Sequence, residues 1–178
     1  MTSYNYSISK HSLTFVYTNL RSIKNKVEEL NTTISHLNLD MFCLVETWLT
    51  PDVPDGFINL SEYNLYRKDR QSRGGNVLIG CKKILRVKSL SVVEDDEISA
   101  VDIYDSNKKF VQVIVAYNPN FNNTCKLKSL LKTLTSLIVS EEEVLIGGDF
   151  NLPKAFQLFP SNTYESQYKL FSKLLIQI

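Results

Sequence analysis

The chain has 178 residues, of which 43% are hydrophobic and 22% charged, and its formal net charge is +1. These values are typical of one globular domain and exclude a disordered or fibrous chain. No stretch approaches the roughly 20 apolar residues that cross a bilayer. The polar segment 1–12 has no apolar region of the kind that directs secretion. We therefore expect a single domain over residues 1–178 that does not enter a membrane.

Three cysteines, Cys43, Cys81 and Cys125, are scattered, odd in number and without the spacing of a metal site. This pattern favours free thiols in a reducing compartment. We expect an intracellular protein, and a nuclear one if it acts on genomic DNA, although the sequence carries no visible targeting signal.

The charges are unevenly distributed along the chain. Between residues 67 and 88 there are eight basic residues and one acid, Asp69, whereas the acids gather at 94–97 and 141–143. The basic segment could face a phosphate backbone. A solvated hairpin whose lysines prevent edge-to-edge pairing explains it equally well when the segment is taken alone.

The first elements form a β-α-β pattern. Residues 13–18 are an apolar run of strand length, and residues 41–45 are a second one. Between them lies an apolar stripe at helical spacing, with Ser22 expected as its N-cap. Its members are Ile23, Val27, Leu30, Ile34 and Leu37. Both strands are apolar on two faces, which is typical of a sheet covered on each side.

Strands dominate the middle of the chain. We predict them at 63–67, 76–80, 85–93, 98–103 and 110–117, with Gly74-Gly75 as the clearest turn. A second amphipathic helix is expected after residues 122–124, then a short strand at 144–146 and a last helix at 167–176. The pattern predicts a layered α/β or α+β domain.

Polar residues stand where several apolar strands end: Asn19, Glu46, Tyr117, and Asp149 with Asn151. Strand ends are where layered folds expose side chains to a shared cleft. Taken singly, each has an ordinary explanation as a turn residue or a solvated charge. The run from Gly147 to Asn151 is the hardest to explain so, because two glycines permit close approach of the backbone.

Together these residue types suit phosphodiester cleavage. Mg²⁺ typically takes one or two protein carboxylates and keeps several waters, a role open to Glu46. A second carboxylate, Asp149, can deprotonate the attacking water. The amides of Asn19 and Asn151 can hold a phosphate or a bound water without adding negative charge, and Tyr117 can donate to a phosphate oxygen.

Five short blocks carry a resemblance to a known family. They are Asn-Leu-Arg-Ser from residue 19, Glu-Thr-Trp-Leu from 46, Ser-Arg-Gly-Gly from 72, Tyr-Asn-Pro-Asn from 117 and Gly-Asp-Phe-Asn from 148. Their order resembles that of the endonuclease/exonuclease/phosphatase superfamily. The best match is to the apurinic-endonuclease-like domain of non-LTR retrotransposons, which the tracts 19–26 and 46–51 resemble most specifically.

The resemblance implies an α/β fold, a four-layer α/β sandwich of two facing mixed β-sheets flanked by helices, here lacking its last strands. It implies that Glu46 is the ligand of Mg²⁺, for which Mn²⁺ can substitute, with Asn19 in the same metal and phosphate site. Tyr117 and Asn120 are the implied contacts to phosphate or the catalytic network. Asp149, assisted by Asn151, is implied to prepare the water.

The resemblance also implies partners. DNA is the expected substrate, and in a full element a reverse transcriptase domain lies on the same chain; we expect a monomer. Candidate nucleic-acid contacts are Arg21, Arg67, Arg70 and Arg73. The Arg73-Gly74-Gly75 block is similar to a structural hairpin, and we assign it no chemistry.

The chain departs from the family pattern in two places. Apurinic endonucleases carry an Asp two residues after the first Asn, where this chain has Arg21; retrotransposon relatives often lack that Asp. The family's site is completed by a terminal Ser-Asp-His, whereas this chain contains only His11 and His36, neither in such a motif. We therefore expect the 178-residue chain alone to be inactive, impaired or poorly folded.

Three hypotheses remain open at this point. The first is a Mg²⁺-dependent DNA-nicking domain of a non-LTR retroelement. The second keeps the superfamily but acts on a lipid or RNA phosphate, which the blocks at 46 and 72 argue against. The third is a non-catalytic remnant or a nucleic-acid-binding module that uses the 67–88 segment. Nicking assays with and without EDTA separate the first from the third.

Overall fold

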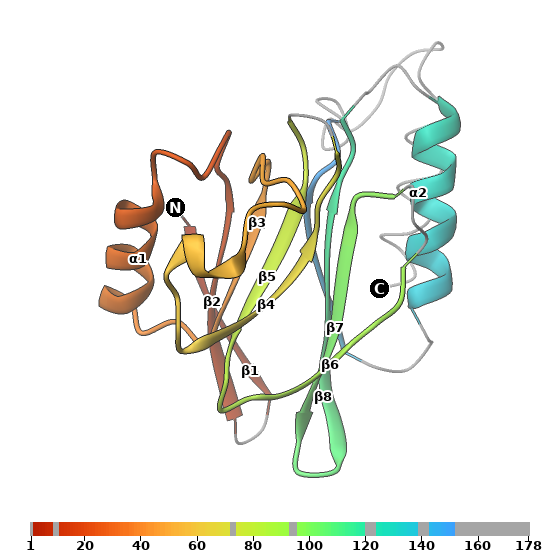
Figure 1. Ribbon diagram of the computed structural model, residues 1–178. Helices are drawn as coiled ribbons and strands as arrows, with labels where there is room; N and C mark the ends of the chain where they lie inside the picture. The colour runs from red at the N-terminus through yellow and green to blue at the C-terminus, as the bar shows by residue number, and fades with distance from the viewer. Residues whose placement is uncertain are drawn as a thin grey trace.

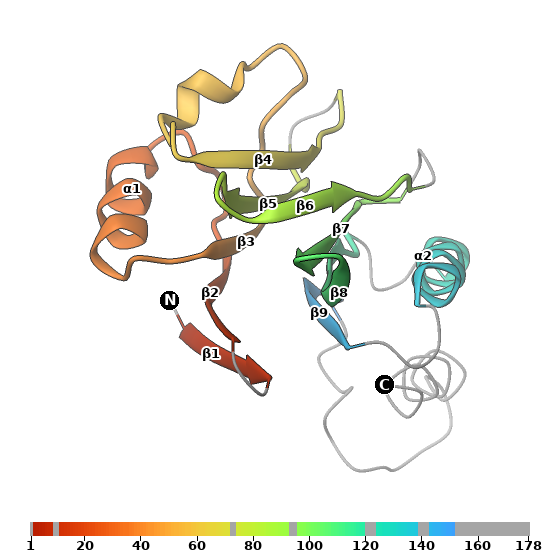
Figure 2. The same ribbon diagram turned by 90° about the horizontal axis from the view of Figure 1, so that it is seen from below.

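The computed structural model describes residues 2–8, 11–71, 74–92, 96–119, 124–138 and 143–151. In these residues two β-sheets face each other, and one helix covers the outer side of each (Figure 1). Figure 2, the view from below, places α1 and α2 on opposite outer sides of the pair of sheets. The helix–sheet–sheet–helix order confirms the four-layer sandwich expected from the sequence.

The first sheet contains five strands in the order β1-β2-β3-β5-β4. Strands β2 and β3 are parallel, and the other neighbours are antiparallel, so the sheet is mixed. The parallel pair is connected through α1 (Val27–His36), whose Leu30 and Ile34 are buried against the outer face. The strands are β1 (Thr2–Ile8), β2 (His11–Asn19), β3 (Met41–Val45), β4 (Tyr63–Lys68) and β5 (Val77–Lys82).

The second sheet contains four strands in the order β6-β7-β8-β9. Strands β8 and β9 are parallel and are connected through α2 (Thr124–Leu137), whose leucines pack on the outer face. The other two pairs are antiparallel. The strands are β6 (Arg86–Ser89), β7 (Ile98–Asp105), β8 (Lys108–Tyr117) and β9 (Val144–Asp149).

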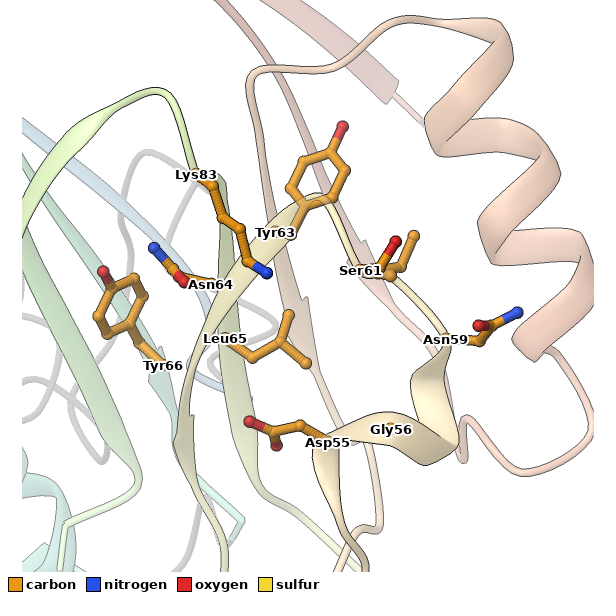
Figure 3. A pocket seen from close by; sticks show the side chains of 10 residues that line it. Asp55, Gly56, Asn59, Ser61, Tyr63, Asn64, Leu65, Tyr66 and Lys83 are labelled. Atoms are coloured by element: carbon orange, nitrogen blue, oxygen red, sulfur yellow. The ribbon is translucent and has the colours of Figure 1, made fainter.

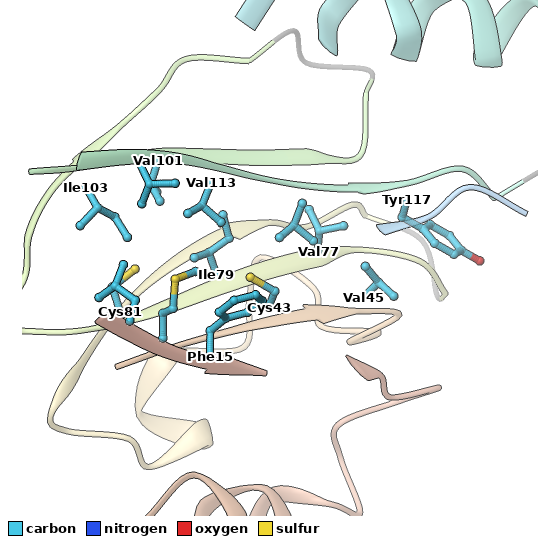
Figure 4. Packing of buried hydrophobic residues seen from close by; sticks show 14 residues of the cluster. Phe15, Cys43, Val45, Val77, Ile79, Cys81, Val101, Ile103, Val113 and Tyr117 are labelled. Carbon is cyan, nitrogen blue, oxygen red and sulfur yellow. The ribbon is translucent and has the colours of Figure 1, made fainter. Parts of the chain in front are cut away.

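The main core lies between the two sheets. Phe15, Cys43 and Ile79 point from the first sheet toward Val101 and Val113 of the second (Figure 4). Successive strand residues point to opposite faces, so the alternate residues of the same strands pack outward under the helices. The inner cluster ends at Val45 and Tyr117, which places one end of the sandwich at the carboxyl ends of β3 and β8.

The structure corrects several sequence predictions. Strand β1 was not expected, because its seven residues are mostly polar; it pairs with β2 at the edge of the first sheet. A short 3₁₀ helix, η1 (Asp55–Ile58), was also missed. The last predicted strand before the acidic run is shorter than 85–93 and spans Arg86–Ser89. The helix predicted at 167–176 lies outside the described residues.

The N-cap prediction for Ser22 is wrong. Helix α1 begins at Val27 with Lys26 at its N-cap, and no side chain caps it. Ser22 has a φ of 92°, and its backbone N–H donates to the carbonyl of Glu46 at 2.8 Å. Ser22 therefore fastens the loop between β2 and α1 to the loop that carries Glu46. In the part of the chain that the structure describes, neither helix is long and apolar enough to cross a bilayer.

Candidate active site at the strand ends

The two parallel strand pairs bring the predicted residues to one end of the sandwich. Asn19 ends β2 and lies opposite Val45, so Glu46 follows at the same edge. Tyr117 ends β8 opposite Asp149, the last residue of β9. Parallel strands end at a common sheet edge, and here the edges of both sheets meet. The sequence could predict each strand end, but only the packing of the sheets joins them.

A single amide connects the two carboxylates of this site. The Asn19 Nδ2 donates to Glu46 Oε1 at 2.8 Å and to Asp149 Oδ2 at 3.0 Å. Its own Oδ1 accepts from the backbone N–H of Arg21 at 3.1 Å, which fixes the rotation of the amide. Glu46 directly follows a strand of the first sheet, and Asp149 is the last residue of a strand of the second. Asn19 therefore holds oxygens from both sheets close enough to contact one small ligand.

Glu46 is held in an unusual backbone conformation. Its φ is 54° and that of Trp48 is 56°, in the left-handed region that costs a non-glycine residue on the order of 1–3 kcal/mol. Backbone bonds fasten this loop on both sides: Ile23 N–H donates to Thr47 O at 3.0 Å, and Trp48 N–H donates to Gly75 O at 3.2 Å. These bonds offset the strain and turn Glu46 toward Asn19.

Two tyrosines flank the carboxylates. Burial together with the charges of Glu46, Glu97 and Asp149 raises the pKa of Tyr117 to about 12. Burial, followed by the charge of Asp149, also raises the pKa of Tyr17. Both phenols therefore remain protonated near neutral pH. Tyr117 is a hydrogen-bond donor that is only 8% exposed.

The ring of Tyr17 also explains a glycine. A Cβ on Gly147 would lie 3.3 Å from Cδ2 of that ring, a contact tighter than normal packing. The missing side chain lets β9 approach β2 closely. This approach brings Asp149 within hydrogen-bond distance of Asn19, although the two residues are 130 positions apart in the chain.

Asp149 and Asn151 form a compact turn after β9. The backbone N–H of Asn151 donates to Asp149 Oδ1 at 3.0 Å, and Asn151 has a φ of 49°. The Asn151 Nδ2 donates to the carbonyl of Asn118 at 2.6 Å. The two oxygens of Asp149 are thus fixed from opposite sides, by Asn19 and by its own turn.

The sequence reasoning missed Glu97, which lies beside this site. Its side chain is buried, pairs with Arg70 at 3.1 Å and accepts the backbone N–H of Asn76. Its carbonyl accepts the N–H of Tyr117 at 2.9 Å. Burial raises the pKa of Glu97, with the Asn76 bond and Arg70 opposing the change. Glu97 stands in a run of four acids, where nothing local distinguishes it.

Two of the four predicted arginine contacts, Arg67 and Arg70, have protein partners. Arg67 binds Asp55 at 2.6 Å and also Asp69, and it donates to two carbonyls of the preceding loop; its side chain is 11% exposed. Arg70 pairs with Glu97 and donates to Gly74 O at 2.8 Å. Arg21 is exposed next to Asn19. Binding of nucleic acid by these arginines stays a prediction, and Arg73 and Asn120 lie outside the described residues.

The donors at the strand ends suit a magnesium ion that keeps most of its waters. Among the described residues, no three His, Cys, Asp or Glu side chains form a metal cluster. Mg²⁺ usually needs only one or two carboxylates. Glu46 and Asp149 provide these, and in the described part of the chain neither forms an ion pair with Lys or Arg. Their negative charge is therefore available to a cation.

A separate hollow beside β4 has different chemistry. Its volume is about 620 Å³, and its walls include Asn59, Leu65 and Lys83 (Figure 3). Its single carboxylate, Asp55, is bound to Arg67. None of the strand-end residues lines it. The hollow therefore offers no counterpart to the paired carboxylates at the end of the sandwich.

Comparison with known proteins gives structural matches only. No family model and no curated protein sequence matches the chain. An AP endonuclease from Archaeoglobus fulgidus is similar with a TM-score of 0.65 and 15% identity, over 90% of this chain and 68% of that one. The 3′ phosphatase NExo from Neisseria, bound to a product DNA hairpin, gives a TM-score of 0.67 and 15% identity, over 93% and 71%.

The endonuclease domain of TRAS1, a telomere-specific non-LTR retrotransposon, is similar to the same degree. Its TM-score is 0.64 at 15% identity, over 89% of this chain and 69% of that one. At such identities the likeness establishes the arrangement of strands and helices. It does not establish the chemistry of the site, which depends on the side chains.

Proposed function

Since the chain has the fold of the endonuclease/exonuclease/phosphatase superfamily, we propose that it is a metal-dependent phosphodiesterase that nicks DNA, as the endonuclease domain of a non-LTR retroelement. The observation that carries this proposal is the Asn19 amide that joins Glu46 to Asp149. An isolated structural cluster would not need two carboxylates that have no basic partner among the residues the structure describes. A site for a cation and a phosphate would.

Glu46 is the proposed ligand of Mg²⁺ or Mn²⁺, with Asn19 beside it. When bound, the ion supplies positive charge that neutralises the phosphoryl oxygens and stabilises the leaving oxygen. The left-handed backbone of Glu46 and its bond from the Asn19 amide fix the carboxylate before any ligand arrives. Such preorganisation lowers the cost of binding, because the side chain does not have to be ordered again.

Asp149 is the proposed general base. Its Oδ2 faces Asn19 and its Oδ1 faces the Asn151 N–H, so the carboxylate is directed and not free to rotate. It would take a proton from the attacking water. Tyr117, which stays protonated, and the Asn151 amide are the proposed donors to the phosphate oxygens.

DNA is the proposed substrate because of two lines of support. Similar solved structures include a NExo bound to product DNA and the endonuclease domain of a retrotransposon. The blocks at residues 19 and 46 resemble the retrotransposon branch most specifically. On this proposal a reverse transcriptase domain is the partner on the same chain, and a monomeric protein acts in the nucleus.

We expect the rate of DNA nicking to be low. The chain has two histidines: His11 begins β2, at the opposite end from Asn19, and His36 is the last residue of α1. Neither residue lies at the carboxyl end of β2, β3, β8 or β9. Among the described residues at the strand ends no histidine stands beside Asp149 to act as general acid, and the loss of such a group typically costs about 10²–10⁴ in rate. We expect slow nicking that still exceeds the background.

The test is conversion of supercoiled plasmid to the nicked circle by the purified chain. We expect slow, Mg²⁺-dependent nicking that EDTA abolishes and that Asp149→Ala and Glu46→Gln both remove. Glu28→Gln, which changes an exposed carboxylate of α1, is the matched control and should nick normally. Circular dichroism would establish that each variant is folded. Equal nicking by the wild type and Asp149→Ala, or hydrolysis of a phosphoinositide in place of DNA, would contradict the proposal.

A further inference from the structure

Asn118 makes three hydrogen bonds to the last residue of β9 and to the two residues after it. Its backbone N–H donates to Asp149 O at 2.9 Å, and its Nδ2 donates to Phe150 O at 3.0 Å. Its carbonyl accepts from Asn151 Nδ2 at 2.6 Å. The side chain is 1% exposed. One residue therefore binds three consecutive residues at the point where the chain leaves the second sheet.

These bonds act where the strand ladder has already ended. The pairing of β8 with β9 stops at Tyr117 and Asp149. Beyond it Asn151 takes a φ of 49°, so the chain cannot continue the ladder in extended form. The side chain of Asn118 replaces the next ladder bond by reaching Phe150 O. Without this bond the 150–151 turn would depend on its own short contacts.

We propose that Asn118 is a positioning residue for the site, acting through Asn151. This inference rests on the proposed function. The side-chain amide of Asn151 has two N–H bonds, and Asn118 O accepts one of them. The other is then directed by the plane of the amide. The bond from Asn118 Nδ2 keeps the turn in register, so that this second N–H and the Asp149 carboxylate share one fixed orientation.

The chemistry of the side chain supports an amide at this place. The Nδ2 of Asn118 is needed as a donor to a carbonyl, while its Oδ1 is buried without a hydrogen-bond partner among the described residues. A buried polar atom without a partner costs about 1–3 kcal/mol, so the amide is not the cheapest way to fill this space. An Asp would lack the donor and add a charge next to Asp149. Alanine would remove the bond with no new charge.

A double-mutant cycle tests the inference. We expect Asn118→Ala to lower kcat for plasmid nicking by about tenfold with KM changed less than twofold, because misplaced catalytic groups lose rate more than affinity. In an Asn151→Ala background the same change should have almost no further effect. Asn64→Ala, on β4, is the control and should leave kcat unchanged. Independent, multiplicative losses from Asn118→Ala and Asn151→Ala would overturn the inference.

A second readout needs no turnover. By NMR hydrogen exchange in metal-free protein, Asn118→Ala should speed exchange of the Asn151 backbone N–H by about tenfold and leave the β3 amides unchanged. Unchanged exchange at Asn151 would overturn the positioning role even if the enzyme nicks DNA. Faster exchange in a protein that never nicks DNA would sustain the positioning of the turn and reject the proposed function. The two failures are therefore distinguishable.

Discussion

Strands β3 and β9 each carry one carboxylate of the site, but they are held in different ways. All five residues of β3 are buried, and the strand pairs with β2 and β5. All six residues of β9 are half-buried, and among the described residues the strand pairs with β8. Glu46 therefore follows the centre of a sheet. The Asp149 carboxylate is held by two individual bonds, one from the Asn19 side chain and one from the backbone N–H of Asn151.

The difference suits the two proposed roles. A metal ligand needs a fixed carboxylate, and burial of the preceding strand provides it. The geometry of the general base depends on cross-sheet contacts, which include the Tyr17 ring on Gly147 and the bonds of Asn118. Damage to β3 should therefore unfold the protein, whereas damage to β9 should misplace Asp149 first.

The largest expected effect is on the side of β3. Phe42 is fully buried, and its ring lies 5.3 Å from that of Tyr63 between the first sheet and α1. Phe42→Ala should lower the free energy of unfolding by about 3–5 kcal/mol, because it leaves a cavity that the packed neighbours cannot fill. Urea unfolding would measure this. A loss comparable to that of a surface substitution would show that the first sheet is not the stable part.

A methyl group on β9 should have a smaller, more local effect. A Cβ on Gly148 would overlap the carbonyl oxygen of Ala116, so β9 would have to move away from β8. We expect Gly148→Ala to cost roughly 1–3 kcal/mol, as overpacking does, and to reduce nicking more than its stability loss explains. The matched control is Gly56→Ala, where the added Cβ meets nothing within 4 Å. Equal effects of the two substitutions would contradict the proposed sensitivity of β9.

Hydrogen exchange should separate the strands without any mutation. Amides of β3 should exchange only by global unfolding, because both neighbouring strands protect them. Amides of β9 should exchange at least about tenfold faster, through local opening of a half-buried strand. Equal protection of β3 and β9 would show that β9 does not open more readily than β3.

The smallest expected effect is a dependence of protein stability on pH through Tyr117, which lies between the two sheets. The pKa of Tyr117 is raised to about 12, above the value of about 10 for an exposed tyrosine. The folded state therefore holds this proton more tightly than the unfolded state. Its contribution to stability is fully present below pH 10 and is lost as the pH rises toward 12. Tyr117→Phe should flatten the fall of Tm between about pH 10 and 12; an unchanged slope would argue against this assignment.

The positions of the strand ends were predictable from the sequence, whereas the contacts between these ends were not. Apolar runs located β2, β3, β8 and β9, so Asn19 and Glu46 could be placed at their ends from the sequence alone. Glu97 and Tyr17 were missed because their roles depend on which sheet faces which. Asn118 was quoted only as part of a Pro-containing block, since a local pattern cannot reveal that it bonds to a strand more than 25 residues later.

Polar and irregular segments account for the other errors. Strand β1 alternates Tyr4, Tyr6 and Ile8 with polar residues, but four of its seven residues are polar and it was not recognised; pairing with β2 specifies it. Ser22 is a residue type that favours the N-cap, but its backbone N–H donates to Glu46 O, so Ser22 lies in a loop and not at the start of the helix. Arg67 and Arg70 belong to a basic stretch of sequence, and the fold pairs them with Asp55 and Glu97. In each case a tertiary contact overrides a local preference.

Binding of Mn²⁺ followed by electron paramagnetic resonance tests the central claim most directly, because it does not depend on the rate of nicking. We predict one Mn²⁺ site per chain, from which Mg²⁺ displaces the bound Mn²⁺. Glu46→Gln should weaken it by at least about tenfold, since it removes the only proposed charged ligand. Glu28→Gln, the control on α1, should bind as the wild type does. Equal Mn²⁺ affinity in the wild type and Glu46→Gln would contradict the assignment of Glu46 as the metal ligand.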